Sequence, residues 1–272
     1  MKKLNVLLSA SVLALALVGC AAVEDDLNAI KDEIQADIDE AKDDLAEVKD
    51  EITGNKDEQD AEETEQNTEE TESVMTYAEY LAADVDTEVV IECYVQATQS
   101  WWDNKITVYA ADEDGAYFIY NMTCSEEDAA KLTEGVKIKV NGFKSVWAGE
   151  IEVAEGATFE FEDGNYVSGV TNVTEFIGTD DLANYMNQKV GFVDMTVEAV
   201  SYKNDTPGDD IYVTLSKDGV KVEFCLEYYL NGSDEDFYAT VGNLEVGSVV
   251  DAEGFLYWYE GANPHITAVT VK

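Results

Sequence analysis

The sequence contains no arginine: all sixteen of its basic residues are lysines, set against 59 aspartates and glutamates. A chain with a formal charge of −43 repels polyphosphates and anionic lipid head groups. The planar guanidinium that binds phosphate in a bidentate manner is also missing. The composition therefore disfavours nucleic acid as a partner and favours cationic partners, neutral sugars, proteins or metal ions.

Histidine and paired cysteines are equally scarce. His265 is the only histidine, which excludes histidine-cluster metal sites and histidine-based catalytic triads. Beyond Cys20, the cysteines Cys93, Cys124 and Cys225 form no CxxC motif, and Cys93 falls on the inward phase of a strand, where we expect packing. The acidic runs lack the ligand spacing of a calcium loop. We therefore expect no enzyme activity, no cofactor and no dedicated metal site.

A short basic and apolar segment opens the sequence. Lys2 and Lys3 precede an apolar stretch that ends at Gly19 and Cys20, a layout typical of an export signal and too short for a membrane span. No later segment is apolar enough to cross a membrane. Residues 17–20, LVGC, resemble the lipobox of bacterial lipoproteins, in which the signal is cut before a cysteine that then carries lipid.

This resemblance implies a signal peptide over residues 1–19 and a lipid attachment site at Cys20. We expect the mature chain to be anchored to the cell membrane through lipidated Cys20 and to face outside the cytoplasm. The alternative is an ordinary secretory signal with an incidental cysteine.

Residues 20–54 carry apolar side chains every three or four positions from Val23 to Ile52, the period of an α-helix. Nearly all other positions are acidic, so the sequence predicts an acidic helical stalk. Two interpretations stay open: a single solvated spacer helix, or a coiled coil formed with a partner or by self-association. Residues 55–74 have the composition of a disordered acidic linker.

The rest of the sequence contains one pattern twice. LTEGVKIKVNGF at 132–143 matches LEVGSVVDAEGF at 244–255 in a single register, 112 residues apart. Upstream of each, an Asp-Gly pair at 114–115 or 218–219 separates two strand-like runs, which predicts a hairpin. A repeat of this length indicates two copies of one domain.

Each copy therefore consists of three strands, a helix and two more strands. The helices should begin at the capping boxes of residues 125–128 and 233–236. This order resembles the OB-fold, a five-stranded Greek-key barrel, as in OB-like modules of exported proteins from Gram-positive bacteria. We expect two tandem OB-like barrels, at 75–165 and 166–272, in a mainly β protein; an immunoglobulin-like sandwich would need about seven strands and no internal helix.

An OB barrel binds its ligand over strands two and three, between the loop joining strands one and two and the loop joining strands four and five. Aromatic residues fall in these loops in both copies, and the candidate ligand-binding residues are Trp101, Trp102, Trp147, Tyr202, Tyr257, Trp258 and Tyr259. Each of them has the alternative role of closing the barrel as part of its core. Because neighbouring strand residues face opposite ways, we expect that Trp101 and Trp102 are not buried together.

These features predict a membrane-anchored binding protein whose aromatic loops recognise a glycan or another cell-envelope component. A scaffold lipoprotein that docks an envelope protein through its head or stalk is the alternative. Nucleic-acid binding, which rests on fold analogy alone, comes third.

Overall fold

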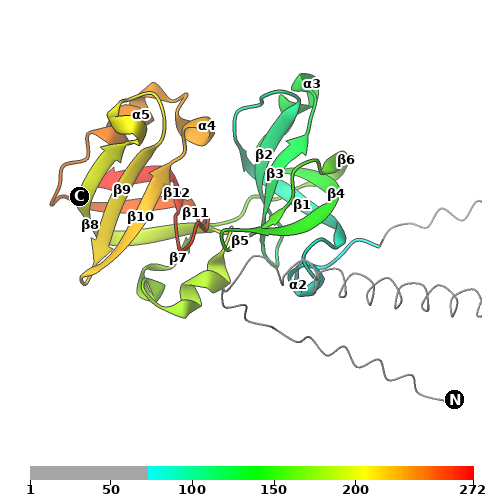
Figure 1. The fold of residues 1–272 in the computed structure, drawn as a ribbon, viewed down its shortest axis with the longest axis horizontal. Helices are drawn as coiled ribbons and strands as arrows, with labels where there is room; N and C mark the ends of the chain where they lie inside the picture. The colour runs from blue at the N-terminus through cyan, green and yellow to red at the C-terminus, as the bar shows by residue number, and fades with distance from the viewer. Residues whose placement is uncertain (1–72) are drawn as a thin grey trace, which may run out of the picture. The chain divides into compact units, whose positions relative to one another are not determined.

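The computed structural model describes residues 73–272, which lie within one compact unit (Figure 1). The expected signal peptide, lipidated Cys20, stalk and nearly all of the linker lie outside the described residues. Within residues 73–272, no helix is long and apolar enough to cross a membrane.

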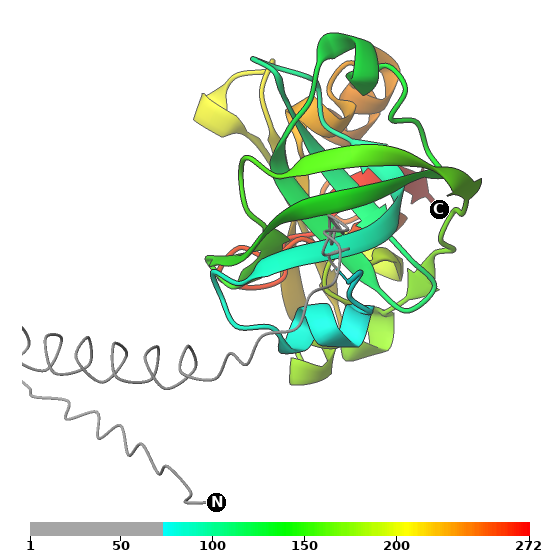
Figure 2. The ribbon, with the colours of Figure 1, turned by 90° about the vertical axis from the view of Figure 1, so that its right-hand side faces the viewer.

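The first half of the described chain forms a closed β-barrel, called barrel 1. Its sheet has the order β1-β2-β3-β5-β4, β4 pairs back to β1, and β6 extends the other edge of β4. Helix α2 precedes the barrel and α3 lies between its third and fourth strands (Figures 1 and 2). The elements are α2 (Tyr77–Ala82), β1 (Glu88–Thr98), β2 (Lys105–Ala111), β3 (Ala116–Thr123), α3 (Glu126–Ala129), β4 (Val136–Trp147), β5 (Glu150–Val153) and β6 (Thr158–Asn165).

The second half forms barrel 2, with the sheet order β8-β9-β10-β12-β11 and closure between β11 and β8. Strands β10 and β12 pair in parallel only at Cys225 and His265. The elements are β7 (Thr171–Asn172), η1 (Thr174–Phe176), η2 (Asp180–Tyr185), β8 (Lys189–Tyr202), η3 (Lys203–Asp205), β9 (Ile211–Lys217), β10 (Val220–Leu226), α4 (Tyr228–Asn231), α5 (Glu235–Gly242), β11 (Val249–Phe255) and β12 (His265–Val271).

The two barrels share one topology, because each has an antiparallel three-strand meander, a helix, and a fourth strand that pairs with both the first and the fifth. A five-stranded barrel with this order and a helix between strands three and four is an OB-like fold. The mainly β architecture is therefore confirmed, with a closed five-stranded OB-like barrel followed by a second sheet of corresponding strand order.

The second hairpin shows how the sequence sets this topology. Asp218 and Gly219 have φ angles of 52° and 85°, so both occupy the left-handed region that a two-residue hairpin turn requires. Lys217 pairs with Val220 across the turn, and the register continues from there to Ile211 and Leu226. A residue pair that tolerates positive φ thus fixes the pairing of β9 with β10.

Each barrel has its own apolar core. Cys93 in β1 and Met195 in β8 occupy equivalent inward positions and are both fully buried. Burial raises the pKa of the Cys93 thiol, which keeps it protonated and unreactive. The expected packing role of Cys93 is confirmed.

Aromatic side chains also join the two barrels to each other. Tyr109 and Phe118 of barrel 1 pack with Phe255 of barrel 2, and the rings of Tyr109 and Phe255 stack at 4.6 Å. The Tyr109 hydroxyl lies 2.6 Å from Nδ1 of His265. Because burial lowers the pKa of His265 to about 3, this imidazole is neutral and the contact carries no net charge.

Candidate ligand groove

The loop between β1 and β2 forms a tight turn at one end of barrel 1. Asp103 and Asn104 have φ angles of 48° and 60°, and Trp102 and Lys105 exchange two backbone hydrogen bonds around them. Asp and Asn enter the left-handed region more readily than other residues with a side chain, so the sequence DN specifies this turn. The turn places Trp102 opposite Lys105, at the start of β2.

The two neighbouring tryptophans have different environments. Trp101 packs against the core of barrel 1, and its indole nitrogen donates a hydrogen bond to the carbonyl of Cys124 at 2.8 Å. Trp102 is 70% exposed. The expectation that they are not buried together is confirmed, and only Trp102 offers a free aromatic face.

Beside Trp102 the surface is hollowed into a groove of about 330 Å³ over β2 and β3. We call it the cross-barrel groove, because barrel 1 supplies most of its wall and barrel 2 supplies one residue. It is lined by Gln99, Ser100, Trp102, Lys105, Ile106, Thr107, Tyr120, Asn121 and Tyr229. Trp102, Tyr120 and Tyr229 are exposed by 70%, 40% and 56%, so three aromatic rings are open to a ligand.

Helix α4 of barrel 2 brings Tyr229 to the groove. The amide and the hydroxyl of Ser100 both donate to the carbonyl oxygen of Tyr229, at 2.7 and 3.1 Å, which ties the first loop of barrel 1 to α4. Asn231 donates from its side chain to the carbonyl of Ile266 and fixes the other end of the helix to β12.

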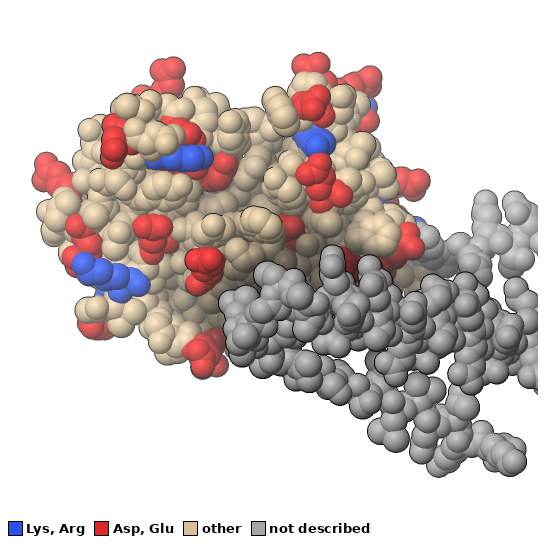
Figure 3. Space-filling model, viewed as in Figure 1, with Lys and Arg blue, Asp and Glu red and all other residues tan. Residues whose placement is uncertain are grey.

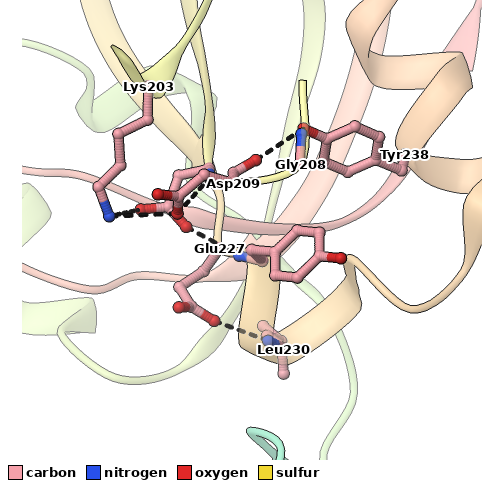
Figure 4. Close-up of polar contacts among 8 residues, drawn as sticks. Lys203, Gly208, Asp209, Glu227, Leu230 and Tyr238 are labelled. Carbon is pink, nitrogen blue, oxygen red and sulfur yellow. Dashed lines mark hydrogen bonds and ion pairs between the residues drawn. The ribbon is translucent and has the colours of Figure 1, made fainter. Parts of the chain in front are cut away.

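A polar network holds the start of α4 (Figure 4). The Asp210 carboxylate accepts from the Tyr228 amide at 2.9 Å, and Lys203 pairs with Asp210 at 3.0 Å. The Glu227 carboxylate accepts from the Leu230 amide and caps the helix. Burial, with a smaller contribution from Asp210, raises the pKa of Glu227 to about 7. The network sets the position of α4, and therefore that of Tyr229.

Tyr238 in α5 completes this network. Its hydroxyl donates to the carbonyl of Asp209 at 2.7 Å and accepts from the amide of Gly208 at 2.9 Å (Figure 4). The loop from Lys203 to Asp210, which corresponds to the first loop of barrel 1, is therefore fastened to helix α5.

Polar side chains that can form hydrogen bonds with a ligand lie on the floor of the groove. Gln99 donates to the Tyr109 hydroxyl at 3.1 Å, which leaves its carbonyl oxygen available as an acceptor. Lys105 and the Asn121 side chain both bind the Glu155 carboxylate. The groove therefore combines stacking surfaces with amide groups, and its one lysine is already paired.

The surface around the groove is acidic. Residues 73–272 contain 37 carboxylates and ten lysines, and Figure 3 shows acidic side chains spread over the viewed face among few lysines. Asp103 lies on the turn beside Trp102, and Glu126 lines the continuation of the groove towards α3. A ligand therefore meets rings and amides within a negative field.

The structure separates the seven aromatic residues that the sequence singled out. Trp102 lines the groove, and Trp101 borders its continuation towards α3. Tyr202 packs against the core of barrel 2, where its hydroxyl crowds Gly242, so the structure places it in the barrel's packing rather than on an open rim.

The other four aromatic residues lie where the barrels meet. Tyr257 stacks on His265 at 4.4 Å and packs against Phe118. The Trp258 indole lies against Gly149 in the turn between β4 and β5, and the amide of Glu260 donates to the Ala148 carbonyl of the same turn. Trp147 and Tyr259 remain exposed by 62% and 55% beside this contact.

The sequence did not single out Tyr120 and Tyr229. Tyr120 follows the buried run of β3 from Ala116 to Ile119 and is 40% exposed, and only the structure reveals this exposure. Tyr229 lies in α4, a helix that we did not expect because its N-cap is Glu227, which is not among the favoured capping residues. The helix of the second copy is also capped by Asp234 rather than by Ser233.

Within residues 73–272, no group of three or more histidine, cysteine or acidic residues is arranged to hold a metal ion. Cys93, Cys124 and Cys225 are free thiols and are buried. Burial raises the pKa of all three, so they are poor nucleophiles.

No protein-family model and no curated protein matches the sequence. Several solved structures are similar to parts of this chain, at low identity and low TM-score. A structure described as a murine DNA-binding protein bound to double-stranded DNA is 10% identical, with a TM-score of 0.35, over 67% of this chain and 94% of that one. The p204 HINb domain is 12% identical, with a TM-score of 0.34, over 70% of this chain and 100% of that one.

The Ifi202 HINa domain in complex with a 20-base-pair DNA is 13% identical, with a TM-score of 0.33, over 68% of this chain and 98% of that one. These structures contradict two expectations from the sequence, because those with a stated ligand are complexes with DNA. The glycan-binding function is not supported, and the prediction that nucleic acid is an unlikely partner is contradicted by these complexes. The net charge and the lack of arginine, on which that prediction rested, do not describe an individual site.

Proposed function

We propose that residues 73–272 form a binding module that holds a chain-like ligand in the cross-barrel groove by stacking. The observation that carries this proposal is the convergence of Trp102, Tyr120 and Tyr229, three exposed rings from two barrels, on one groove. Exposed aromatic side chains gathered in one hollow are typical of a binding site, whereas isolated exposed rings are ordinary surface features.

Single-stranded nucleic acid is the first candidate ligand. The groove lies over β2 and β3 and beside the loop between β1 and β2, the face on which OB barrels bind oligonucleotides. Each base offers a flat face for an aromatic ring, and such a stack contributes roughly 1–3 kcal/mol. Gln99 and Asn121 offer amides for base edges. The acidic surroundings repel the phosphates, so the rings and amides would supply the attraction.

A basic polypeptide segment is the second candidate, favoured by the charge around the groove. Asp103 and Glu126 lie beside it, and the lysine that lines it is neutralised by Glu155. An extended segment with lysine or arginine and an aromatic residue could stack on Trp102 and place its cation beside these carboxylates.

One titration distinguishes the two ligands by whether added salt raises or lowers their affinity for the protein. A fluorescein-labelled single-stranded DNA of about ten nucleotides and a labelled basic peptide are each titrated with the full chain at low and high salt. Screening should strengthen the binding of the oligonucleotide, because protein and ligand repel, and should weaken the binding of the peptide.

The groove itself is tested by matched variants. Trp102→Ala and Tyr229→Ala should each remove roughly 1–3 kcal/mol of affinity for whichever ligand binds. Trp147→Ala is the control, since Trp147 is similarly exposed but lies outside the groove, and it should leave affinity unchanged. Equal losses in Trp102→Ala and Trp147→Ala, or no binding of either ligand, would overturn the proposal.

We also propose that this module is displayed outside the cytoplasm on a lipid anchor at Cys20. The support is the LVGC sequence after a basic and apolar leader. Anchoring would place the groove at a membrane surface without a membrane-spanning segment.

A further inference from the structure

Strand β6 forms an open edge of the barrel 1 sheet. It is the last strand in the sheet order and lies beside β4, on the side away from β1 (Figure 2). Strand β3, which approaches the start of β6, ends at Thr123, whose amide donates to the carbonyl of Ala157 directly before β6. Strand β6 therefore continues beyond the point where β3 stops, and its outer edge pairs with no strand within residues 73–272.

The backbone hydrogen bonds of β4 alternate between its two neighbours. The amide of Lys144 donates to the carbonyl of Thr87, next to β1, and the carbonyl of Phe143 accepts from the amide of Ala154, next to β5. Hydrogen-bonded pairs alternate along an antiparallel ladder, and the register of β4 with β1 is unbroken between residues 137 and 143. The even-numbered residues of β4 therefore bind β1, and the odd-numbered residues bind β6.

This alternation leaves the backbone groups of two phenylalanines in β6 without a partner strand. Glu160 and Glu162 lie opposite odd-numbered residues of β4, so their backbone groups bind β4. The amide and carbonyl groups of Phe159 and Phe161 therefore point to the outer edge. No hydrogen bond from another segment within residues 73–272 reaches these groups. An incoming strand can donate and accept hydrogen bonds at both positions.

A hollow of about 280 Å³ lies beside this edge. One wall is formed by Thr158, Phe159 and Phe161 of β6, and the other by residues 123–125 and Asp128, at the end of β3 and in α3. The rings of Phe159 and Phe161 pack edge to face at 5.2 Å, and Phe161 is 40% exposed. The open backbone groups are therefore next to a hollow that offers aromatic surface to the side chains of an added strand.

The charge beside the edge is negative. Lys131 and Lys137, whose side chains lie nearby, are each paired with two carboxylates. Glu160 and Asp163 of β6 are exposed and form no ion pair within residues 73–272, and Lys139 lies opposite Glu160 on β4. Two carboxylates therefore remain against one lysine, and the edge favours a partner with positive charge.

The two faces of the edge differ in chemistry. Neighbouring residues of a strand face opposite sides of the sheet, so the rings of Phe159 and Phe161 lie on the side of the hollow and the carboxylate of Glu160 lies on the other side. An added strand places its side chains alternately next to the rings and next to the carboxylate. Apolar and basic residues in alternation therefore complement the two faces.

We propose that the outer edge of β6 binds an extended polypeptide segment of alternating apolar and basic residues, which adds a strand to the sheet of barrel 1. Its apolar side chains enter the hollow beside Phe159 and Phe161, and its basic side chains face Glu160. The hollow shares no lining residue with the cross-barrel groove, so this inference does not depend on the proposed function.

Amide hydrogen exchange in the full chain, followed by NMR, tests the added strand directly. The probe is a peptide of about eight residues in which lysine and valine alternate. At saturation it should slow exchange of the Phe159 and Phe161 amides roughly tenfold or more. The amides of Glu160 and Glu162, which already bind β4, are the internal control and should change much less. Unchanged exchange at Phe159 and Phe161, or equal slowing of all four amides, would overturn the proposal.

Methylation of the peptide backbone separates strand addition from attraction between charges. One version carries a methyl group on every valine nitrogen and the other on every lysine nitrogen, so charge and composition are the same. A strand presents alternate amides to its neighbour, and in an antiparallel arrangement the valine-methylated version should bind roughly tenfold or more weakly than the other. Fluorescence anisotropy measures both affinities in Trp102→Ala, which lacks a stacking surface of the cross-barrel groove. Equal affinities would contradict strand addition.

Matched variants in the same Trp102→Ala background locate the peptide. Phe161→Ala removes part of the wall of the hollow and should weaken peptide binding roughly three- to tenfold. Phe143→Ala is the control, because this ring of β4 is 52% exposed and does not line the hollow, and it should bind like its parent. Equal affinities of the Phe161→Ala and Phe143→Ala variants would place the peptide elsewhere and overturn the proposal.

Sedimentation velocity of the full chain without peptide tests the other possible occupant of an open edge, which is a second copy of the chain. The carboxylates of two β6 strands would repel each other, so we expect no association through this edge. A dimer in which the Phe159 and Phe161 amides are protected without peptide would show that the edge joins two copies, and would overturn the proposal.

Discussion

The carboxylate of Glu150 in β5 accepts a hydrogen bond from the backbone amide of Trp258, 108 residues later in the chain, at 2.7 Å. This bond joins the β4–β5 end of barrel 1 to the β11–β12 loop of barrel 2. Because Glu150 is fully buried, the contact couples the docking of the barrels to the protonation of a carboxyl group.

The first prediction concerns this coupling. Burial raises the pKa of Glu150 to about 8 in the folded chain, above the value of about 4.5 for an exposed glutamate. The folded state then binds the proton more tightly than the unfolded state, so the free energy of unfolding should fall as pH rises from about 4.5 to 8, by up to ~1.4 kcal/mol per pH unit from this group. Urea unfolding at several pH values measures it.

Glu150→Gln should reduce this slope, since glutamine does not titrate, and the buried Glu152 and Glu227 should account for the rest. Glu223→Gln, at an exposed position in β10, is the matched control and should keep the wild-type slope. An identical slope in the wild type and Glu150→Gln would show that Glu150 ionises equally in both states.

The second prediction concerns the polar centre of the contact between the barrels. Tyr109→Phe removes the hydroxyl that joins Gln99 to His265 and leaves a buried imidazole nitrogen unpaired. We expect a loss of about 1–3 kcal/mol in the free energy of unfolding. Tyr120→Phe removes a hydroxyl from an exposed ring and should change stability by less than about 0.5 kcal/mol. Similar urea midpoints for the two variants would contradict a structural role for the Tyr109 hydroxyl.

The third prediction separates the neighbouring tryptophans. Trp101→Ala removes a ring packed on the core of barrel 1 and its hydrogen bond to Cys124, so it should destabilise the fold by about 3 kcal/mol. Trp102→Ala removes an exposed ring and should leave the urea midpoint within the range of ordinary surface changes. Strong destabilisation by Trp102→Ala would mean that this ring closes the barrel instead of facing a ligand.

The fourth prediction concerns the anchor. Cells that produce the protein should incorporate a fatty-acid probe into the wild type and not into Cys20→Ala, because the lipid is expected on that thiol. Cys225→Ala, a buried cysteine of barrel 2, should label like the wild type. Equal labelling of Cys20→Ala and the wild type would refute the lipobox interpretation.

The fold could be predicted because its determinants are local. Asp218 and Gly219 specify a turn with two positive φ angles, and alternating apolar residues on either side specify the strands. The first copy has an Asp-Gly pair at the corresponding place, Asp114 and Gly115, which made the topology recognisable twice, although its turn is longer, with Ala111 paired to Ala116. Short turns then cause strands that are consecutive in the chain to pair with each other.

The candidate groove was only partly predictable, because it depends on contacts between the copies. Tyr229 reaches the groove only because Ser100 binds its carbonyl oxygen from the other barrel. Tyr257 lies in a loop that could face a ligand, yet it stacks on His265 instead. Loop position along one barrel does not distinguish an aromatic ring that binds a ligand from one that binds the neighbouring barrel.

Fluorine NMR of the full chain with 5-fluorotryptophan tests the central claim most directly, because the protein has four tryptophans and each gives its own resonance after assignment with Trp→Phe variants. When the oligonucleotide or the basic peptide is added, the Trp102 resonance should shift in a saturable way. The resonances of Trp147 and Trp258, which lie outside the groove, should stay in place. Saturable shifts at Trp147 or Trp258, with Trp102 unchanged, would contradict a ligand site in the cross-barrel groove.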